Sequence, residues 1–367
     1  MGIKNIEIAK QLNISTAAVS LARNNRPGVS AATRASVRRI VDEYNAAHPA
    51  ESILPSDQEL LFVVHKTHGQ VIKDTPFFNE MMEAIQRVGL NASYTIPVVN
   101  YTQGEDSFSL LSLCNRETAK GILLLASEMN EDEFQLYKQI EKPLVVIDAH
   151  FPTAYVDCIG IDNEYLVRQG VRYAHKMGHR HIGFLASRVF TYNFLERLAA
   201  YRTAMNELEL EIGEQDIAYL HCTANQAFED MRRYLAACDP AELPTCFVAG
   251  NDLLAMGAIK ALKEYQIRIP QDISIIGFDD MPIVAMMDPP LTSLHFNTCD
   301  ICQMAVHRLV QKIQGDASCC RADIRGWLMP RDSVYDRICW ANFSKTFRRS
   351  QQAILPKCDH TAQFFTI

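Results

Sequence analysis

Apolar residues in the first 48 positions recur at helical spacing. The pattern predicts three helices, over 5–12, over 16–23 and after residue 30. Asn13 tolerates the left-handed conformation that a tight turn needs, and Ser15 is placed to cap the second helix. Two short helices about a turn, braced by a third, predict a helix-turn-helix module. The alternative is a helical hairpin that only packs on the next domain.

From residue 59 onward, short apolar runs alternate with helical patterns such as 78–88. Continuous apolar strands separated by helices are typical of parallel sheets that are covered on both faces. Nine strands exceed one comfortable sheet, so we expect an α/β core of two doubly wound parallel-sheet lobes. The predicted strands are 60–64, 93–98, 121–125, 143–147, 158–161, 182–185, 218–221, 246–249 and 273–277.

Composition narrows the class of protein. The length of 367 residues predicts two to three compact units, and 48% hydrophobic with 22% charged residues is typical of globular chains. No apolar run reaches the ~18 residues that a membrane helix needs, and no secretory signal pattern opens the chain. The eleven cysteines then favour free thiols in a reducing compartment. We therefore expect a cytoplasmic protein without a membrane partner.

Charge is divided unevenly along the chain. Residues 1–48 carry seven basic and three acidic side chains, so this head carries +4 and the rest of the chain −11. A basic head predicts contact with a polyanion, and a helix-turn-helix places the exposed face of its second helix in the major groove of DNA. On that face lie Thr16, Ala17 and Ser20. Next to the phosphates we expect Asn24, Ser30 and Arg34.

Polar residues follow several of the predicted strands. They are Ser127, Asp148, Asp162, Asn251, Asp252, Asp279 and Asp280. Ligands of parallel α/β sheets gather at the carboxyl ends of the strands, where carboxylates and amides suit sugar hydroxyls. Phe77, Phe78 and Phe278 suit the face of a sugar ring. The alternative is that each Asp or Asn only caps the next helix, as we expect of Asn163, but the succession favours a cleft.

Residues 5–34 resemble the DNA-binding head of the lactose-repressor/galactose-repressor (LacI/GalR) family of bacterial transcription regulators. The matching pieces are Ile8-Ala9, Ile14-Ser15, Ala18-Val19-Ser20, Asn24 and Val29-Ser30 followed by Thr33-Arg34. Through about residue 333, further landmarks resemble the family's effector-binding core, whose fold is similar to that of periplasmic sugar-binding proteins. These are GIDN (160–163), KMGHRHIGFLA (176–186), RLAAY (197–201), GNDLLAMGA (250–258), IPQDISIIGFDD (269–280) and PPLTSL (289–294).

The resemblance implies a homodimeric repressor that binds double-stranded operator DNA and is switched by a small effector, of which a sugar is the expected kind. The set of residues expected to contact DNA is Ser15, Thr16, Ala17, Ser20, Leu21, Asn24, Ser30 and Arg34. The set that the resemblance places around the effector is Phe77, Phe78, Ser127, Asp148, Arg197, Asn251 and Asp279.

The sequence also departs from the family pattern. Asn13 stands where the family usually has glycine, and Leu21 stands where many members have an arginine that reads guanine. Leucine offers only apolar contact, for example to a thymine methyl group. The hinge-helix signature is missing from 45–58, where Pro49 and Pro55 hinder a helix and Leu54 is the residue left to enter the minor groove.

These observations divide the chain into a head (1–48), a linker (49–58), a two-lobed core (59–333) and an extension (334–367) without leucine heptads or an assigned role. By the resemblance, the core crosses between its lobes three times. The expected first lobe is 59–157 with 290–320. The expected second lobe is 158–289 with 321–333.

No catalytic residue, metal site or cofactor is predicted. His175, His179 and His181 have metal-like spacing, but they surround a helix-to-strand turn and we expect structural roles for them. Cys299 and Cys302 form a lone CxxC without the second pair that zinc sites need, so buried or incidental thiols are expected. Two other functions stay open, a sugar-binding sensor that does not act on DNA and a sugar or nucleoside enzyme using Asp148 and Asp279.

Overall fold

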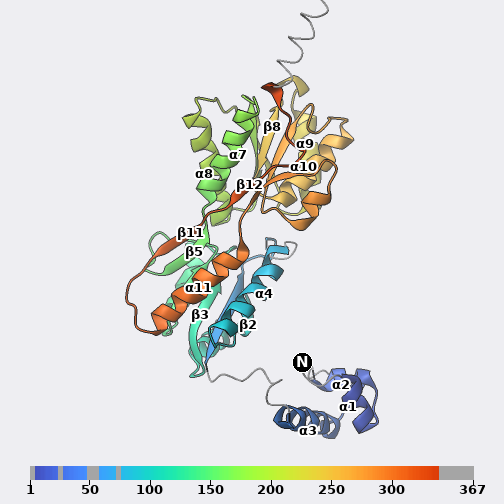
Figure 1. Cartoon of the computed structure of the whole chain (residues 1–367), viewed down its shortest axis with the longest axis vertical. Coiled ribbons are helices and arrows are strands. Elements are labelled where there is room, and N and C mark those ends of the chain that lie inside the picture. Colours follow the sequence, from blue (N-terminus) through green and yellow to red (C-terminus); the bar gives the residue numbers. More distant parts are fainter. Residues whose placement is uncertain (1–4, 24–27, 48–57, 72–75, 339–367) are drawn as a thin grey trace, which may run out of the picture. The chain divides into compact units, whose positions relative to one another are not determined.

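A computed structural model of the chain describes residues 5–23, 28–47, 58–71 and 76–338 (Figure 1). The chain divides into two compact units, Met1–Glu59 with Ser93–Thr95 and Leu60–Ala92 with Ile96–Ile367. The second unit contains two α/β lobes. No helix among the described residues has the length and apolar character that crossing a membrane requires.

Three helices form the head: α1 (Asn5–Leu12), α2 (Thr16–Arg23) and α3 (Ala31–Ala47). Asn13 has a φ of 50°, and the Ile14 amide donates to the Ala9 carbonyl at 3.0 Å, so the chain turns sharply after α1. Ser15 caps α2, because its hydroxyl accepts a hydrogen bond from the Ala18 amide at 3.1 Å. The predicted three-helix arrangement is confirmed. Its core consists of Ile8, Ala9, Val19, Val37 and Ile40.

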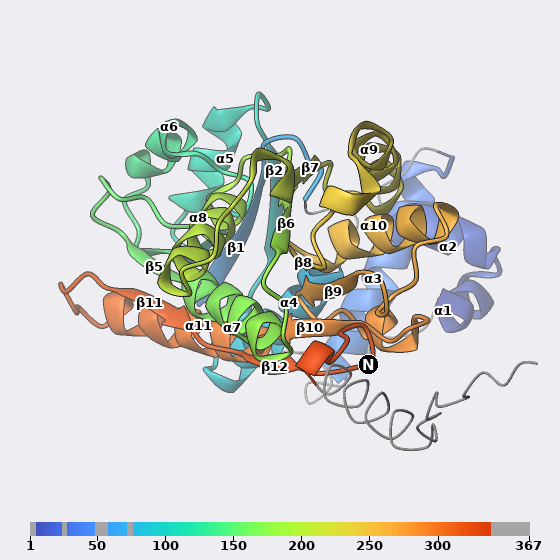
Figure 2. The same cartoon turned by 90° about the horizontal axis from the view of Figure 1, so that it is seen from above.

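The first lobe is built on a six-stranded sheet with the order β11-β5-β4-β3-β1-β2. Helices α4 (Pro76–Asn91) and α11 (Thr298–Ile313) pack together on one face, whereas α5 (Ser107–Cys114) and α6 (Glu131–Phe134) lie on the other (Figure 2). The strands are β1 (Glu59–Lys66), β2 (Val98–Thr102), β3 (Ala119–Leu125), β4 (Leu144–Ile147), β5 (Asp157–Ile161) and β11 (Arg321–Ile324).

The second lobe repeats this plan with the order β12-β10-β9-β8-β6-β7. Helices α7 (Asn163–Lys176) and α8 (Tyr192–Glu207) cover one face, and α9 (Ala224–Ala237) and α10 (Asp252–Glu264) cover the other (Figure 2). The strands are β6 (Ile182–Ser187), β7 (Ile217–Leu220), β8 (Cys246–Ala249), β9 (Ser274–Phe278), β10 (Thr292–His295) and β12 (Trp327–Met329).

Burial on both faces explains the continuous apolar runs. In β9, Ile275 packs into the core under α9 and α10, whereas its neighbour Ile276 faces Gly170 of α7. Successive side chains of a strand point to opposite faces, so both must be apolar when helices cover both faces. The prediction of two doubly wound lobes is therefore confirmed, with one exception, because β12 runs antiparallel to β10.

The places where the chain crosses between the lobes differ from those we expected. Strand β5 belongs to the first sheet, so the first crossing follows Ile161 and does not precede residue 158. Strand β10 pairs with β9 in the second sheet, although 290–320 was expected in the first lobe. Strand β11 pairs with β5 in the first sheet, although 321–333 was expected in the second. Strands β10 and β11 are short and lack the apolar runs that mark the central strands.

The structure also corrects the start of one predicted strand and places the start of the extension. The strand predicted at 93–98 starts only at Val98, because Ser93 adopts a turn conformation with a φ of 65°. The start of the extension packs on the second lobe, where Val334 is buried and the Tyr335 amide donates to Ser274 Oγ at 2.9 Å. Outside the described residues lie 48–57, with Pro49, Leu54 and Pro55, and 339–367.

Candidate functional site

A cavity of about 40 Å³ lies between the two lobes, where strands of both sheets end. The seven residues that we placed around an effector, one of them an arginine on α8, all line it. The complete lining is Val71, Phe77, Phe78, Ser127, Asp148, Ile161, Thr191, Asn193, Phe194, Arg197, Asn251, Asp279 and Phe296. The structure thus brings together side chains from positions more than 200 residues apart in one cleft.

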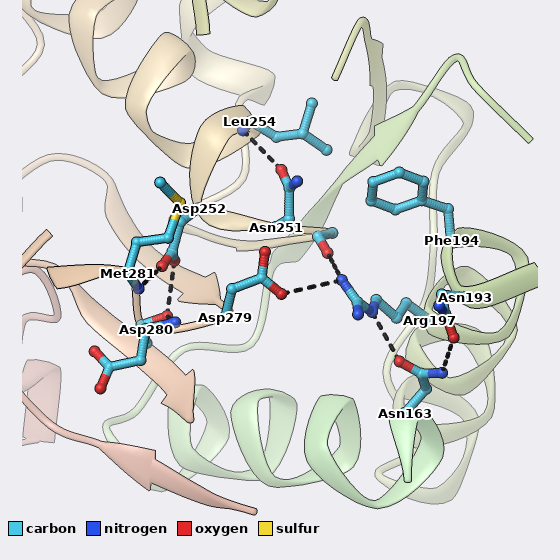
Figure 3. Close-up of polar contacts among 12 residues, drawn as sticks. Asn163, Asn193, Phe194, Arg197, Asn251, Asp252, Leu254, Asp279, Asp280 and Met281 are labelled. Atoms are coloured by element: carbon cyan, nitrogen blue, oxygen red, sulfur yellow. Dashed lines mark hydrogen bonds and ion pairs between the residues drawn. The ribbon is translucent and has the colours of Figure 1, made fainter. Parts of the chain in front are cut away.

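Arg197 lies at the centre of the polar wall (Figure 3). Its guanidinium donates to the Gly250 carbonyl at 2.7 Å and to Asn163 Oδ1 at 2.8 Å, and lies 3.6 Å from a carboxylate oxygen of Asp279. The Phe278 ring lies beneath it, with its centroid 3.6 Å from the guanidinium carbon. These contacts fix the orientation of a buried cation, which can offer N–H donors to a polar guest.

Asp148 forms the opposite polar wall and links the lobes. Its carboxylate accepts hydrogen bonds from Ser127 Oγ at 2.5 Å and from Asn193 Nδ2 at 2.9 Å. Asn193 belongs to α8 of the second lobe, so this contact spans the cleft. Burial raises the pKa of Asp148, and its φ of 63° lies in the left-handed region. A non-glycine residue in that conformation is held there by its surroundings, as is common at functional sites.

A buried carboxylate supports the loop that carries Asp279. Asp252, at the start of α10, accepts hydrogen bonds from the Met281 amide at 2.8 Å and from Ser293 Oγ at 2.7 Å. Burial raises the pKa of Asp252 well above its ordinary value. Asp279 and Asp280 both have left-handed backbones, with φ of 105° and 52°. Asp252 therefore holds a strained loop in place at the end of β9.

Two of the polar residues at strand ends, Asp162 and Asn251, cap the next helix, whereas Asn163 does not. Asn251 lines the cavity and also caps α10, because its side chain accepts from the Leu254 amide at 3.0 Å. Asn163 does not cap α7, since Asp162 takes that role. Its amide group instead donates to Asn193 Oδ1 at 2.8 Å and accepts from Arg197. Asn163 is thus a support for the arginine, which the sequence pattern did not reveal.

The apolar wall differs partly from the one we expected. Phe77 packs edge-on against Phe78 and against Phe296, with ring centroids 5.1 Å and 5.6 Å apart. Phe278 does not line the cavity, because it is fully buried beneath Arg197. Sequence reasoning missed six lining residues. For two of them a signal existed, since they precede the arginine by three or four positions on one helix: Asn193 and Phe194.

The charge state of Asp279 predicts a pH dependence. Burial raises its pKa to about 7, although Arg197 opposes the shift and Asp148 adds to it. The folded protein therefore keeps a proton that the unfolded chain releases above its ordinary pKa of 3.8. The free energy of unfolding should fall as pH rises from about 4 to about 7, and the contribution of this group should be level above that.

An Asp279→Asn protein cannot titrate at this position, so its unfolding midpoint in urea should fall less between about pH 5 and pH 7 than that of the wild type. Asp272→Asn is the matched control, because Arg268 lowers the pKa of Asp272 to about 2, below this window. Equal pH slopes for the wild type and Asp279→Asn would contradict the assignment.

The predicted DNA-contacting residues lie at the start of α2 and around the start of α3. Ser15, Thr16 and Ala17 are exposed, and Ser20 is half-buried. Leu21 is half-buried beside Gly28, whose φ of 114° requires glycine. Ser30 is exposed and caps α3 through the Thr33 amide at 3.0 Å, and Arg34 is half-buried one turn later. Asn24 lies outside the described residues.

The histidines serve the structure locally. His179 is buried between Thr245 Oγ1 at 2.9 Å and the Tyr335 carbonyl at 3.2 Å, and burial lowers its pKa to about 4. His181 contacts Asp216 at 2.6 Å. Within the part of the chain that the structure describes, no group of three or more His, Cys, Asp or Glu residues is placed to hold a metal ion.

The chain is similar in sequence to a family of binding domains and to transcriptional repressors. Residues 171–334 match the family described as "Periplasmic binding protein-like domain". The chain is 26% identical over 338 residues to the HTH-type transcriptional repressor PurR of Haemophilus influenzae (strain PittEE), covering 89% of this chain and 97% of that protein. It is also 26% identical over 314 residues to the HTH-type transcriptional repressor CytR of Escherichia coli (strain K12), covering 84% and 89%.

Solved structures share the fold. A complex of the transcriptional regulator CelR with cellobiose has a TM-score of 0.68 at 23% identity and covers 89% of this chain and 98% of its own. The lac repressor dimer bound to operator and the anti-inducer ONPF has a TM-score of 0.66 at 21% identity, covering 91% and 100%. Two parallel-sheet lobes preceded by short helices are common to this chain and to these regulators.

The named relatives are transcriptional repressors and not enzymes, and they align with this chain over most of their length. The alignment with PurR spans too much of the chain to be explained by the core alone. The names of these relatives give them a helix-turn-helix, and the solved structures share the two-lobed core. Over most of its length the chain is therefore similar to HTH-type transcriptional repressors, and it shares the two-lobed fold of the lac repressor.

Proposed function

We propose that the chain is a DNA-binding transcriptional repressor of the LacI/GalR type, that it acts as a homodimer on operator DNA, and that a small carbohydrate in the interlobe cleft changes its affinity for the operator. The head (1–48) binds the duplex, the linker (49–58) connects it, and the core (59–333) binds the effector and the second subunit. The observation that carries the proposal is the convergence of Asp148, Arg197, Asn251 and Asp279 on one cavity between the lobes.

The chemistry of the cleft favours a polyhydroxylated guest. Carboxylates accept from vicinal hydroxyls, the Arg197 guanidinium donates to hydroxyl oxygens, and the rings of Phe77 and Phe296 offer an apolar face. A complex with cellobiose in a regulator of similar fold supports a sugar. The alternative classes for the test are sugar phosphates and nucleobases.

Because the cavity is small, binding of a guest requires the two lobes to move. Its volume of about 40 Å³ is far below the ~300 Å³ of typical small-molecule sites. A sugar therefore enters only if the lobes move apart, and its hydroxyls then compete for the hydrogen bond between Asn193 and Asp148. Because that bond joins the lobes, effector binding changes their relative position. Such coupling is typically worth about 1–3 kcal/mol.

An apolar surface on the first lobe supports the second subunit. A cavity of about 780 Å³ lies along α4 and α11, lined by residues that include Val88, Met304 and Val310. Leu90 and Met304 are 50% and 40% exposed on the same helices. Exposed apolar surface of this kind favours association. Two subunits would present their heads to half-sites about 34 Å apart, and a monomer in sedimentation experiments would contradict the proposal.

DNA binding is tested by gel shift with the duplexes upstream of neighbouring genes over a range of salt concentrations. We expect Arg34→Ala to weaken binding to all duplexes alike and to flatten the salt dependence by about one phosphate contact. Arg202→Ala on α8 is the control, because it removes the same charge from an exposed position of the core. No shifted band at any salt concentration would remove the DNA-binding half of the proposal.

The effector is tested by thermal unfolding with a panel of sugars, sugar phosphates and nucleobases. A compound that binds only the folded protein raises its stability by RT ln(1 + [L]/Kd). A shift from sugars alone supports the proposal. If only nucleobases raise the thermal stability, the cleft remains the proposed binding site, but its effector is a nucleobase and not a carbohydrate.

A further inference from the structure

Cys299 and Cys302 lie in the first two turns of α11, which packs beside α4 (Figure 1). Asn297 caps this helix by accepting from the Cys299 amide at 2.9 Å. Both sulfur atoms face α4, since Cys299 Sγ accepts from Arg87 Nη2 at 3.4 Å and Cys302 Sγ donates to the Met81 carbonyl at 3.7 Å. The two thiols therefore share one helix interface.

The sulfur of Cys299 lies among hydrogen-bond donors. Its sulfur accepts hydrogen bonds from the guanidinium of Arg87 and, at 3.4 Å, from Gln303 Nε2. It also lies in the first turn of a 16-residue helix, whose amino end carries partial positive charge. A guanidinium, N–H donors and a helix amino end each stabilise negative charge on sulfur.

The two cysteines differ in access. Cys299 is half-buried and lines an open cavity of about 280 Å³ beside Ala84 and His295, so a small oxidant can reach it. Cys302 is fully buried, and burial raises the pKa of its thiol to about 12. An accessible sulfur next to a buried one is the arrangement of an attacking and a resolving cysteine.

We propose that Cys299 and Cys302 are a redox pair in which a peroxide oxidises Cys299 and Cys302 then closes a disulfide with it. The Cys299 sulfur attacks one oxygen of hydrogen peroxide, the O–O bond breaks, and the leaving hydroxide takes a proton to become water. Cys299 then carries S–OH. The Cys302 sulfur attacks it, gives up its proton, and the S–O bond breaks to release a second water. The two thiols lose two electrons, which reduce the peroxide.

Closing the disulfide changes the start of α11. A disulfide needs Cβ atoms about 4 Å apart, whereas residues three apart on a helix are separated by about 5–6 Å. The first turn must therefore rearrange, and it can, because the first amides of a helix have no partner within it. Phe296, which precedes the helix, lines both this cavity and the interlobe cleft. A rearrangement at the start of α11 thus shifts Phe296, which packs against Phe77 in the wall of the interlobe cleft.

The test uses the full-length reduced protein, treated with increasing hydrogen peroxide, alkylated with iodoacetamide and digested with trypsin. Peptide 269–308 contains both cysteines of the pair and no other cysteine, so the disulfide appears as the loss of two hydrogens and of both alkyl groups. Cys319 and Cys320 are internal controls, the first half-buried and the second exposed. We expect the pair to be oxidised at about tenfold lower peroxide than either control.

Single variants separate the two roles. In Cys302→Ser the oxidised Cys299 has no resolving partner, so dimedone, which reacts with sulfenic acids, should label it. The wild type should show little label, and Cys299→Ser should leave Cys302 reduced. Three results would overturn the proposal. They are oxidation of Cys319 or Cys320 before the pair, equal dimedone labelling of Cys299 in the wild type and Cys302→Ser, and oxidation of Cys302 in Cys299→Ser.

Discussion

An Arg197→Ala protein is expected to lose about 3 kcal/mol of folding free energy and all of its response to the effector. The guanidinium is buried between the Gly250 carbonyl, Asn163 and Asp279, and its removal leaves the Asp279 carboxylate without its cation. Breaking a buried ion pair from one side typically costs about 3–5 kcal/mol. Urea unfolding at about pH 8, where Asp279 with its pKa of about 7 is ionised, measures the loss, and thermal shift with the sugar that stabilises the wild type measures the response.

Three variants make this result specific. Arg202→Ala removes an exposed arginine from the same helix and should change neither quantity. Arg197→Lys keeps the charge but replaces the planar fork, whose separate nitrogens donate to Asn163 and Gly250, with a single ammonium group, so it should recover most of the stability without the response. In the double variant with Asp279→Asn no carboxylate is left unpaired, so the cost should be less than the sum of the single costs. An effector shift that persists in Arg197→Ala would show that the cleft is not the binding site.

The central strands could be predicted because both of their faces are buried, so that each of them is an uninterrupted apolar run in the sequence. The edge strands carry no such signal. In β11, Arg321 and Asp323 alternate with Ala322 and Ile324, and the strand exists because β5 offers a parallel partner at Cys158. The positions of the lobe crossings depend on β11 and on β10, which also lacks an apolar run. The positions of these crossings could therefore not be predicted from the local sequence pattern, nor from the family resemblance, which has no landmark motif in β11.

The cleft could be predicted by residue type and by the resemblance, but its internal support could not. Polar residues at strand ends predicted Asp148 and Asp279, because parallel strands all end at one edge. The contacts that orient Arg197 come from the Gly250 carbonyl and from Asn163, which only the packing of α7 against α8 brings near. The left-handed backbone of Asp148 is likewise a product of its surroundings, since aspartate has no strong preference for it.

A methyl group at Gly277 is expected to destabilise the second lobe and to disturb the support of the cleft. The added Cβ of Gly277→Ala would lie 2.0 Å from Asp252 Oδ1 and 2.8 Å from Leu291 Cδ2, both within the core. Asp252 would have to give up its contact with Ser293 or its hold on the Met281 amide. Overpacking costs about 1–3 kcal/mol, and a buried polar group left unpaired about 1–3 kcal/mol more.

Gly160→Ala in β5 is the matched control, because it adds the same methyl group to a strand glycine whose nearest neighbour, Asp323 Oδ1, is 3.5 Å away. Its stability should stay within about 1 kcal/mol of the wild type. Gly277→Ala should in addition weaken the effector response, since Asp252 positions the loop that carries Asp279 into the cleft. Equal unfolding midpoints for the two variants would mean that Asp252 is not held as tightly as its contacts indicate, and the support of the polar wall would have to be sought elsewhere.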